Sequence, residues 1–353
     1  MQRSGARAAR RAYSAAADAR TARLFPGIKR LCDLVIESGQ GSTVTTTDGA
    51  VYLDMTAGIG VTSTGHCHPK VVAAVQEQAT KLTHAQMSCF YSDISLQLAE
   101  RLTGIAPGMD VAFFANSGAE AVENAVRVAR QATQRDGVIA MLGGYHGRTA
   151  QALALTTSGT SYRGQHPGPL PAGTVVAPFP YEYAGVSQEA ALDGLHRLMA
   201  SQASPAEIAA LILEPIQGEG GYTVPPAGYV AALRSFCDEH GILLIADEVQ
   251  SGVGRTGRMW ALDHECAPRN PEPPGAQAPL SLLRASGVAA QGGGVCRHYR
   301  HCQRPGVRLP DLSRADHRRA RRGAALESEF LRRHVRRQRR RLRRGPRDAG
   351  RDR

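Results

Sequence analysis

The run Leu243-Leu244-Ile245-Ala246-Asp247-Glu248-Val249-Gln250 is the stretch that decides the fold of this chain. Its apolar part is too short for a helix and ends in a carboxylate, which predicts a buried parallel strand with Asp247 at its carboxyl edge. Open α/β sheets bind ligands at that edge, so a carboxylate there favours a buried cationic partner. An aspartate that only caps the next helix is the alternative.

Strand and helix signals alternate upstream of this run. Expected strands cover residues 111–114, 138–141, 208–213 and 242–246; expected helices cover residues 69–82, 96–102 and 229–240, with another after residue 119. This alternation predicts an α/β fold with a mostly parallel sheet and right-handed crossovers. Earlier in the chain, Asp48-Gly49 between two β-branched runs predicts a β-hairpin.

The 353 residues carry a formal net charge of +12, and the excess lies at the two ends of the chain. Residues 1–24 hold six arginines among alanine and serine, with Asp18 the only acid. This composition is typical of a mitochondrial transit peptide and predicts a location in the mitochondrial matrix. The alternative is a basic leader without a targeting signal, and the chain would then be cytoplasmic.

Composition also argues against several classes of site. No apolar run is long enough to span a bilayer, so we expect no membrane contact. The seven cysteines are scattered, which favours free thiols over a zinc site or a disulfide framework. His66 and His68 have no carboxylate or cysteine cluster beside them, so they favour a structural loop over a metal site.

The character of the chain changes after Glu265. Residues 268–279 are Pro-rich and aperiodic, and residues 297–353 are dense in arginine and contain no lysine. We therefore expect residues 266–353 to be a disordered basic tail without a helix or strand that buries a face. Clustered arginines also bind phosphates electrostatically, so a nonspecific nucleic-acid-binding protein is the second candidate function.

Several upstream residues suit a ligand with a phosphate and an aromatic ring. Asn116-Ser117-Gly118-Ala119 joins an expected strand to a helix, where free N–H groups and the helix dipole form an anion site. Tyr145 follows the next strand and can lie flat against an aromatic ligand. Asp247 can keep a pyridine nitrogen protonated, and Gln250 can reach a ring hydroxyl. An ordinary capped helix and a core tyrosine are the alternatives for the first two patterns.

Residues 25–265 resemble the class III (fold type I) pyridoxal-phosphate aminotransferases, the group that holds 4-aminobutyrate, ornithine, acetylornithine and alanine–glyoxylate enzymes. The motifs that carry the resemblance, in family order, are residues 116–121 (Asn-Ser-Gly-Ala-Glu-Ala), 145–149 (Tyr-His-Gly-Arg-Thr), 214–221 (Glu-Pro-Ile-Gln-Gly-Glu-Gly-Gly), 247–252 (Asp-Glu-Val-Gln-Ser-Gly) and 254–257 (Gly-Arg-Thr-Gly).

The resemblance implies an N-terminal segment with the hairpin over residues 25–70 and an incomplete cofactor-binding large domain over residues 71–265. The large domain would have helices on both faces of its sheet, with the C-terminal small domain missing or replaced by the tail. It further implies pyridoxal 5'-phosphate as cofactor, an ω-amino acid of the 4-aminobutyrate type as amino donor, a 2-oxo acid as acceptor, and a homodimer.

The resemblance also implies a role for each matching residue. The residues expected to contact the cofactor are Ser117, Gly118, Ala119, Tyr145, His146, Glu214, Asp247, Val249 and Gln250. The first three would hold the phosphate, and Tyr145 would stack on the ring. Asp247 would pair with the ring nitrogen, with Glu214 and Gln250 near the ring hydroxyl. Glu219 matches a glutamate that gates the substrate by pairing with a C-terminal arginine.

The family's Schiff-base lysine has no counterpart in this chain. The lysines are Lys29, Lys70 and Lys81, all upstream of Asp247. Arginine cannot replace the lysine, because it stays protonated and is not an amine nucleophile. We therefore expect no catalytic lysine and no useful transaminase activity from the chain as written.

A shifted reading frame offers an explanation for the missing lysine. Read one base later, the codons of residues 302–311 permit Ala-Lys-Gly-Leu-Ala-Ser-Gly-Phe-Pro-Ile, the family's lysine loop. With the same shift, residues 333–342 permit Gly-Thr-Tyr-Gly-Gly-Asn-Ala-Val-Ala-Cys, which resembles the next family motif. Our hypothesis is that residues 266 to about 294 are an insertion, such as an unspliced intron, and that an out-of-frame reading follows it.

Overall fold

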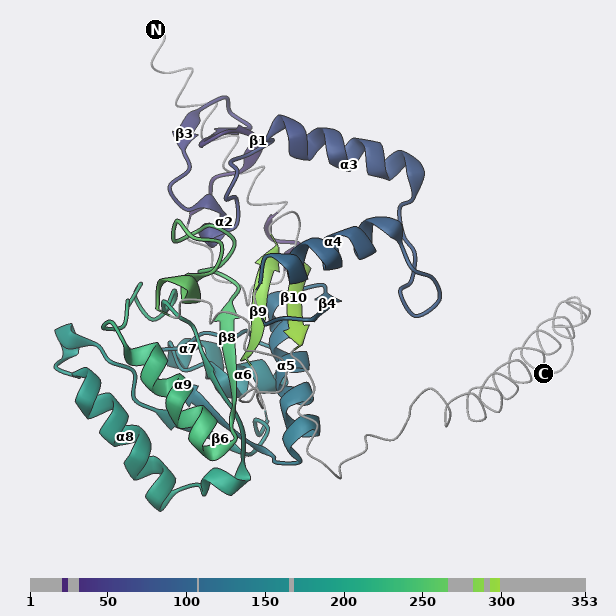
Figure 1. Cartoon of the computed structure of the whole chain (residues 1–353). Coiled ribbons are helices and arrows are strands. Elements are labelled where there is room, and N and C mark those ends of the chain that lie inside the picture. Colours follow the sequence, from purple (N-terminus) through teal and green to yellow (C-terminus); the bar gives the residue numbers. More distant parts are fainter. Residues whose placement is uncertain are drawn as a thin grey trace, which may run out of the picture. The chain divides into compact units, whose positions relative to one another are not determined.

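The computed structural model describes residues 21–24, 32–106, 108–164 and 168–265, together with the backbone of residues 282–288 and 293–298 (Figure 1). Residues 1–20 of the expected transit peptide and most of the Pro- and Arg-rich tail lie outside these ranges. Within the described ranges, no helix combines the length and the hydropathy that crossing a bilayer requires.

A small antiparallel sheet precedes the large one. Its strands are β1 (Ile36–Gln40), β2 (Thr43–Thr46) and β3 (Val51–Leu53), paired in that order. The predicted hairpin between β2 and β3 is confirmed. Gly49 has a φ of +81° in the turn, a value that glycine reaches without the penalty that a Cβ brings. The Thr46 hydroxyl donates to the Asp48 carboxylate and closes the turn.

Three helices connect this small sheet to the large one. They are α2 (Ala57–Gly60), α3 (Pro69–Lys81) and α4 (Asp93–Gly104). A proline in the first turn suits the start of α3, because the N–H that proline lacks has no partner there. The structure thus confirms both predicted helices, and α4 begins three residues before the predicted start at residue 96.

A seven-stranded sheet forms the centre of the described chain, in the order β4-β10-β9-β8-β7-β5-β6, with β10 alone antiparallel to its neighbours. Its strands are β4 (Val111–Ala115), β5 (Gly137–Met141), β6 (Thr174–Ala177), β7 (Ile208–Leu213), β8 (Leu243–Glu248), β9 (Leu282–Val288) and β10 (Gly293–His298). The four predicted parallel strands are confirmed. Strand β6 was not predicted from the sequence.

Helices cover both faces of this sheet, as expected. They are α5 (Gly118–Thr133), α6 (Ala150–Leu155), α7 (Thr160–Arg163), α8 (Gln188–Ser201) and α9 (Tyr229–His240), with 3₁₀ turns at Glu182–Ala184, Pro205–Glu207 and Ala261–His264. Helices α5 and α6 share one buried cluster with Ile212 and Ile245, while α8 and α9 share another with Leu211 and Leu244. Neighbouring residues of a strand point to opposite faces, so β7 and β8 are buried along their whole length.

Strands β9 and β10 differ from the expectation that no strand forms after residue 265. β9 lies parallel to β8, with Leu282 opposite Leu244, and β10 lies between β9 and β4. Backbone pairing explains the difference, because the edges of β8 and β4 carry N–H and C=O groups that an extended segment of almost any sequence can bind. The rest of the tail lies outside the described residues.

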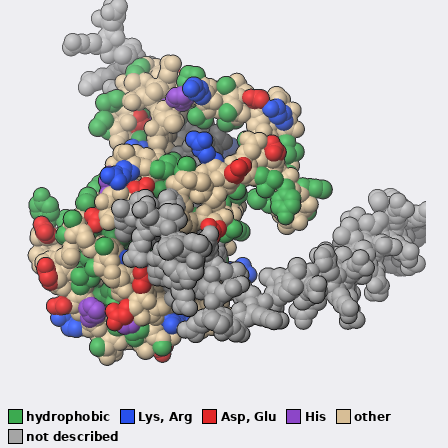
Figure 2. Space-filling view, in the orientation of Figure 1, with side chains coloured by type: hydrophobic (Ala, Val, Ile, Leu, Met, Phe, Trp, Pro, Cys, Tyr) green, Lys and Arg blue, Asp and Glu red, His purple; other side chains and the backbone are tan. Residues whose placement is uncertain are grey.

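Apolar side chains remain uncovered on α3, on α4 and on the loop between them. Helix α3 contains no buried residue, and Val75 is half exposed. Figure 2 shows hydrophobic side chains gathered over the α3–α4 loop, where Phe90 and Tyr91 are 71% and 81% exposed. Large apolar patches are unusual on soluble monomers and mark surfaces that other protein surfaces cover.

Candidate active site

The carboxyl ends of β4, β5, β7 and β8 lie at the same edge of the large sheet, because these strands run in one direction. Each is followed by residues that the sequence singled out. These are Ser117, Gly118 and Ala119 after β4; Tyr145 and His146 after β5; Glu214 after β7; and Asp247, Val249 and Gln250 at the end of β8. The fold therefore brings together four motifs that are far apart in the sequence.

Asp247 binds a histidine that lies 101 residues earlier in the chain. Its Oδ2 is 2.7 Å from Nδ1 of His146, and its Oδ1 accepts a hydrogen bond from the Val249 N–H at 3.1 Å. Asp247 is only 4% exposed, and Nε2 of His146 is buried without a hydrogen-bond partner among the described residues. The predicted position of Asp247, at the end of a buried strand, is confirmed.

Glu214 is a second buried carboxylate at this edge. Its two oxygens accept hydrogen bonds from the N–H groups of Tyr145, at 2.7 Å, and Gly218, at 2.9 Å. Burial raises the pKa of Glu214 to about 7, and the charge of Asp247 adds to the rise, whereas His146 and the two N–H donors oppose it. A carboxyl group in this position can hold or release a proton near neutral pH.

The turn between β4 and α5 has the geometry of an anion site. Ser117 caps α5 by accepting from the Glu120 N–H at 3.2 Å, and the Glu120 carboxylate turns back to the Asn116 N–H at 2.7 Å. Among the described residues, the N–H groups of Gly118 and Ala119 have no acceptor, as expected for the first turn of a helix. They remain available to an anion at the positive end of the helix dipole.

Gly118 also joins this turn to the end of β8. A Cβ built on Gly118 would lie 2.8 Å from Cγ1 of Val249, so only glycine lets the two segments approach this closely. The turn that holds Ser117 therefore lies against the residues that follow Asp247.

Tyr145 lies half-buried beside an aromatic residue that the sequence analysis missed. The ring of Tyr162 meets it edge to face, with 5.1 Å between ring centroids. The Tyr162 hydroxyl donates to Oε2 of Glu219 at 3.0 Å. Burial raises the pKa of Tyr162, and the hydrogen bond to Glu219 raises it further. Nothing in the sequence singles out Tyr162, which lies outside the motifs that carry the family resemblance.

The N-terminal segment closes against the end of β8. Gln250 donates to the Ile59 carbonyl at 3.4 Å, and Arg255 donates to the Gly60 carbonyl at 2.9 Å. In the loop that follows, Nε2 of His66 lies 2.8 Å from the Asp54 carboxylate, and this contact is the main reason that the pKa of Asp54 falls to about 2. His66 thus ties a loop in place, as its sequence context suggested.

Comparison with known proteins gives a consistent family. Residues 27–271 match the model of the family described as aminotransferase class-III. The 5-aminovalerate aminotransferase DavT of Pseudomonas putida is 44% identical over 246 residues, which are 69% of this chain and 58% of that protein. The 4-aminobutyrate aminotransferase GabT of Escherichia coli is 42% identical over 240 residues, 67% of this chain and 56% of that protein. The chain thus spans little more than half the length of these relatives.

Solved structures with the same fold include transaminases. An ω-transaminase from Pseudomonas jessenii, in complex with PMP, superposes with a TM-score of 0.69 at 28% identity, over 79% of this chain and 64% of that one. A taurine:2-oxoglutarate aminotransferase from Bifidobacterium kashiwanohense, in complex with PLP and glutamate, gives 0.68 at 28% identity, over 78% and 62%. By sequence, by fold and by the order of its motifs, this chain belongs to the class-III aminotransferase family.

Proposed function

We propose that the residues at the carboxyl edge of the large sheet bind pyridoxal 5'-phosphate reversibly. We further propose that the chain derives from a transaminase that moves an amino group from an ω-amino acid of the 4-aminobutyrate type to a 2-oxo acid. The observation that carries the proposal is the buried carboxylate of Asp247 at the end of β8, where Val249 packs against Gly118 at the N-terminus of α5. A buried carboxylate and an anion site together suit a ligand with a cationic ring nitrogen and a phosphate.

The residues present suit the ring nitrogen. A carboxylate buried this deeply needs a positive partner, and Asp247 has a neighbour, His146, that orients it through the 2.7 Å contact. Asp247 would hold a proton on the ring nitrogen, and His146 would keep the carboxylate in place. When bound, the protonated pyridine ring of this cofactor withdraws electrons from the carbon next to the amino group.

The phosphate and the faces of the ring also have candidate partners. The N–H groups of Gly118 and Ala119, with the hydroxyl of Ser117, would hold the phosphate. Tyr145 and Val249 would contact the ring from the ends of β5 and β8. These groups bind and orient, and none of them acts as an amine nucleophile.

Glu214 would act at the ring hydroxyl. Its pKa of about 7 means that it can donate a hydrogen bond to this oxygen when protonated and must accept one when ionised. Gln250, held by the Ile59 carbonyl, is the second candidate contact of the hydroxyl.

We expect no covalent attachment of the cofactor to a lysine of this chain. Lys70 and Lys81 lie near the two ends of α3, and Nζ of Lys81 lies 2.5 Å from Glu77. Lys29 lies outside the described residues. No lysine follows Asp247 in the sequence, so we expect reversible binding and no turnover.

Equilibrium dialysis against pyridoxal 5'-phosphate tests the binding. We expect saturable binding that dialysis reverses, and an affinity at least about tenfold lower for Asp247→Asn, because the amide cannot supply the negative charge. Asp238→Asn, which alters a part-buried pair with Arg234 on α9, is the matched control and should bind like the unaltered chain. Absence of saturable binding, equal binding by Asp247→Asn, or a cofactor band that survives dialysis would each contradict the proposal.

We also propose that the chain forms a homodimer. The uncovered apolar side chains of α3 support a homodimer, in which a second copy would cover them. Sedimentation of the chain should give a dimer, and Val75→Glu, a change at an exposed position, should shift it to monomer.

The Arg-rich residues 1–24 support a mitochondrial matrix location, and a fluorescent reporter fused behind them should enter mitochondria.

A further inference from the structure

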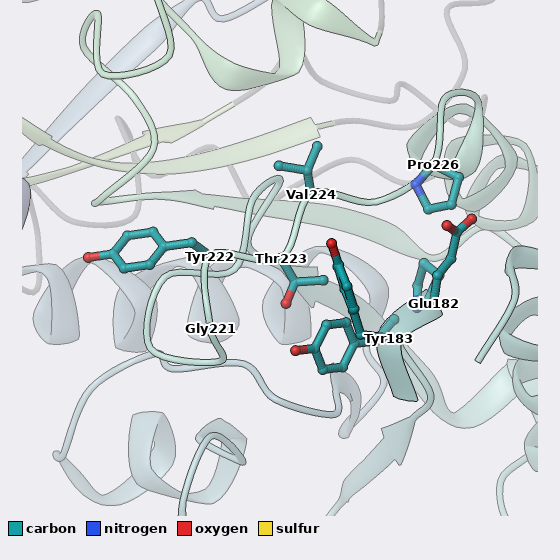
Figure 3. Close-up of a pocket in the computed structure, with 9 residues that line it drawn as sticks. Glu182, Tyr183, Gly221, Tyr222, Thr223, Val224 and Pro226 are labelled. Atoms are coloured by element: carbon teal, nitrogen blue, oxygen red, sulfur yellow. The ribbon is translucent and has the colours of Figure 1, made fainter. Parts of the chain in front are cut away.

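A cavity lies between two loops, and none of the residues that line it belongs to the candidate active site. It is lined by residues 180–183, which follow β6, and by residues 221–224 and 226, which precede α9. Its volume is about 380 Å³. In Figure 3, Tyr183 and Thr223 stand between Tyr222 on one side and Pro226 on the other. Nothing in the proposed transaminase chemistry uses this cavity.

Aromatic rings dominate the lining. Tyr183 and Tyr222 are 98% and 72% exposed, and the ring of Tyr181 lies 6.1 Å from that of Tyr183 at an angle of 59°. Pro180 and Pro226 add apolar surface, and Glu182 is the one charged residue of the lining. Tilted tyrosine rings beside proline form the kind of surface that binds a polyproline II helix, because the rings pack on proline and the hydroxyls reach backbone carbonyls.

The chain itself contains a segment with the matching pattern. Pro268, Pro271 and Pro274 are spaced by three residues, which equals one turn of a polyproline II helix. In that conformation the three prolines would lie on one edge of the helix. Arg269, beside the first of them, is the charge complement of Glu182.

This segment also begins beside the cavity. The carboxylate of Glu265 accepts a hydrogen bond from the Gly228 N–H at 2.8 Å, and Gly228 is two residues beyond Pro226. The chain is next described at Leu282, which pairs with Leu244.

The segment of residues 266–281 is long enough to reach the cavity on its way from Glu265 to Leu282. Leu244 lies near the C-terminal end of α9, whereas Gly228 lies at its N-terminal end, so the two points are roughly 18 Å apart, the length of a 12-residue helix. The 16 residues from 266 to 281 can span about 50 Å as polyproline II. They are therefore much longer than the direct path requires.

We propose that the tyrosine-lined cavity binds residues 268–274 of the same chain as a polyproline II helix. The prolines spaced by three lie against the rings of Tyr181, Tyr183 and Tyr222, and Arg269 lies toward Glu182. The inference is independent of the proposed cofactor binding, because no residue is shared between the two sites.

Limited trypsin digestion of the full chain tests this docking. Arg269 is the one trypsin site between residues 266 and 281, and mass spectrometry resolves its cleavage from all others. We expect the double variant Tyr183→Ala, Tyr222→Ala to be cut about threefold faster after Arg269, the change that follows when a segment docked roughly two-thirds of the time is released. Both tyrosines are exposed, so their removal leaves the fold intact.

Tyr91→Ala is the matched control, since it removes an equally exposed tyrosine that does not line the cavity. It should leave cleavage after Arg269 unchanged. A synthetic peptide with the sequence of residues 266–281 should compete and accelerate cleavage of the unaltered chain, with no effect on the double variant.

Equal cleavage rates in the unaltered chain and the double variant would overturn the proposal. Protection that grows with protein concentration would overturn it as well, because it would assign the cavity to a second copy.

Discussion

Replacing Glu214 by glutamine should abolish a large part of the pH dependence of stability. In the folded chain Glu214 is buried at the carboxyl edge of the sheet, and burial, reinforced by Asp247, raises its pKa from 4.5 to about 7. In the unfolded chain the same carboxyl group loses its proton near its ordinary pKa. Between these two pH values the folded state binds the proton and the unfolded state does not.

The sign and size of the effect follow from that difference. A raised pKa in the folded state stabilises fully below about pH 4.5, and this stabilisation is lost as the pH rises through about 7. The rise in pKa from 4.5 to about 7 corresponds to about 3 kcal/mol in the free energy of unfolding. Glutamine stays neutral, so Glu214→Gln should lose this slope. It should also be about 1–2 kcal/mol less stable at pH 5, because one of the N–H donors of Tyr145 and Gly218 loses its acceptor.

Urea unfolding followed by circular dichroism between pH 5 and pH 8 measures both effects. Glu100→Gln, which replaces an exposed carboxylate on α4, is the control and should follow the unaltered chain at every pH. If Glu214→Gln lost stability between pH 5 and pH 8 as steeply as the unaltered chain, Glu214 would not be the titrating group.

Three further predictions concern the carboxyl edge of the sheet, the core and the tail. Gly118→Ala should lower the free energy of unfolding by about 1–3 kcal/mol, because the added Cβ meets Val249. Urea unfolding measures this change. Gly104→Ala is the control, because its added Cβ meets no atom within 4 Å. Arg135→Met should lower the free energy of unfolding by about 2 kcal/mol in the same assay, since the Arg135 guanidinium donates to four carbonyls, including that of Gly241 beyond α9. Arg127 is exposed, so the control Arg127→Met should change the free energy of unfolding little. Sequencing the transcript should reveal an intron boundary near Glu265, and a continuous reading frame would contradict the frameshift hypothesis.

The order of the motifs in the sequence identified the family, because each motif is a local pattern with its own physical cause. A short apolar run predicts a buried strand, and the polar residue that follows it predicts which edge a ligand meets; Asp247 illustrates both steps. A serine before a helix predicts a cap, as Ser117 provides. Local patterns of this kind also placed the hairpin at Gly49.

Local sequence patterns predicted strands least well where strand pairing uses only backbone groups. Strands β9 and β10 form from residues whose sequence indicated no strand, since open sheet edges bind any extended backbone. Strand β6 was missed because it directly follows residues 167–173, whose prolines and glycines are typical of a loop.

The sequence by itself determined the elements, the family and the absence of a lysine after Asp247. Only the tertiary structure decided which residues meet: His146 with Asp247, Glu219 with Tyr162, and Gly118 with Val249. The physical reason is that crossovers, and not distance along the chain, determine which parallel strands become neighbours. Residues more than 50 positions apart in the sequence thereby come within hydrogen-bonding distance at one edge of a sheet.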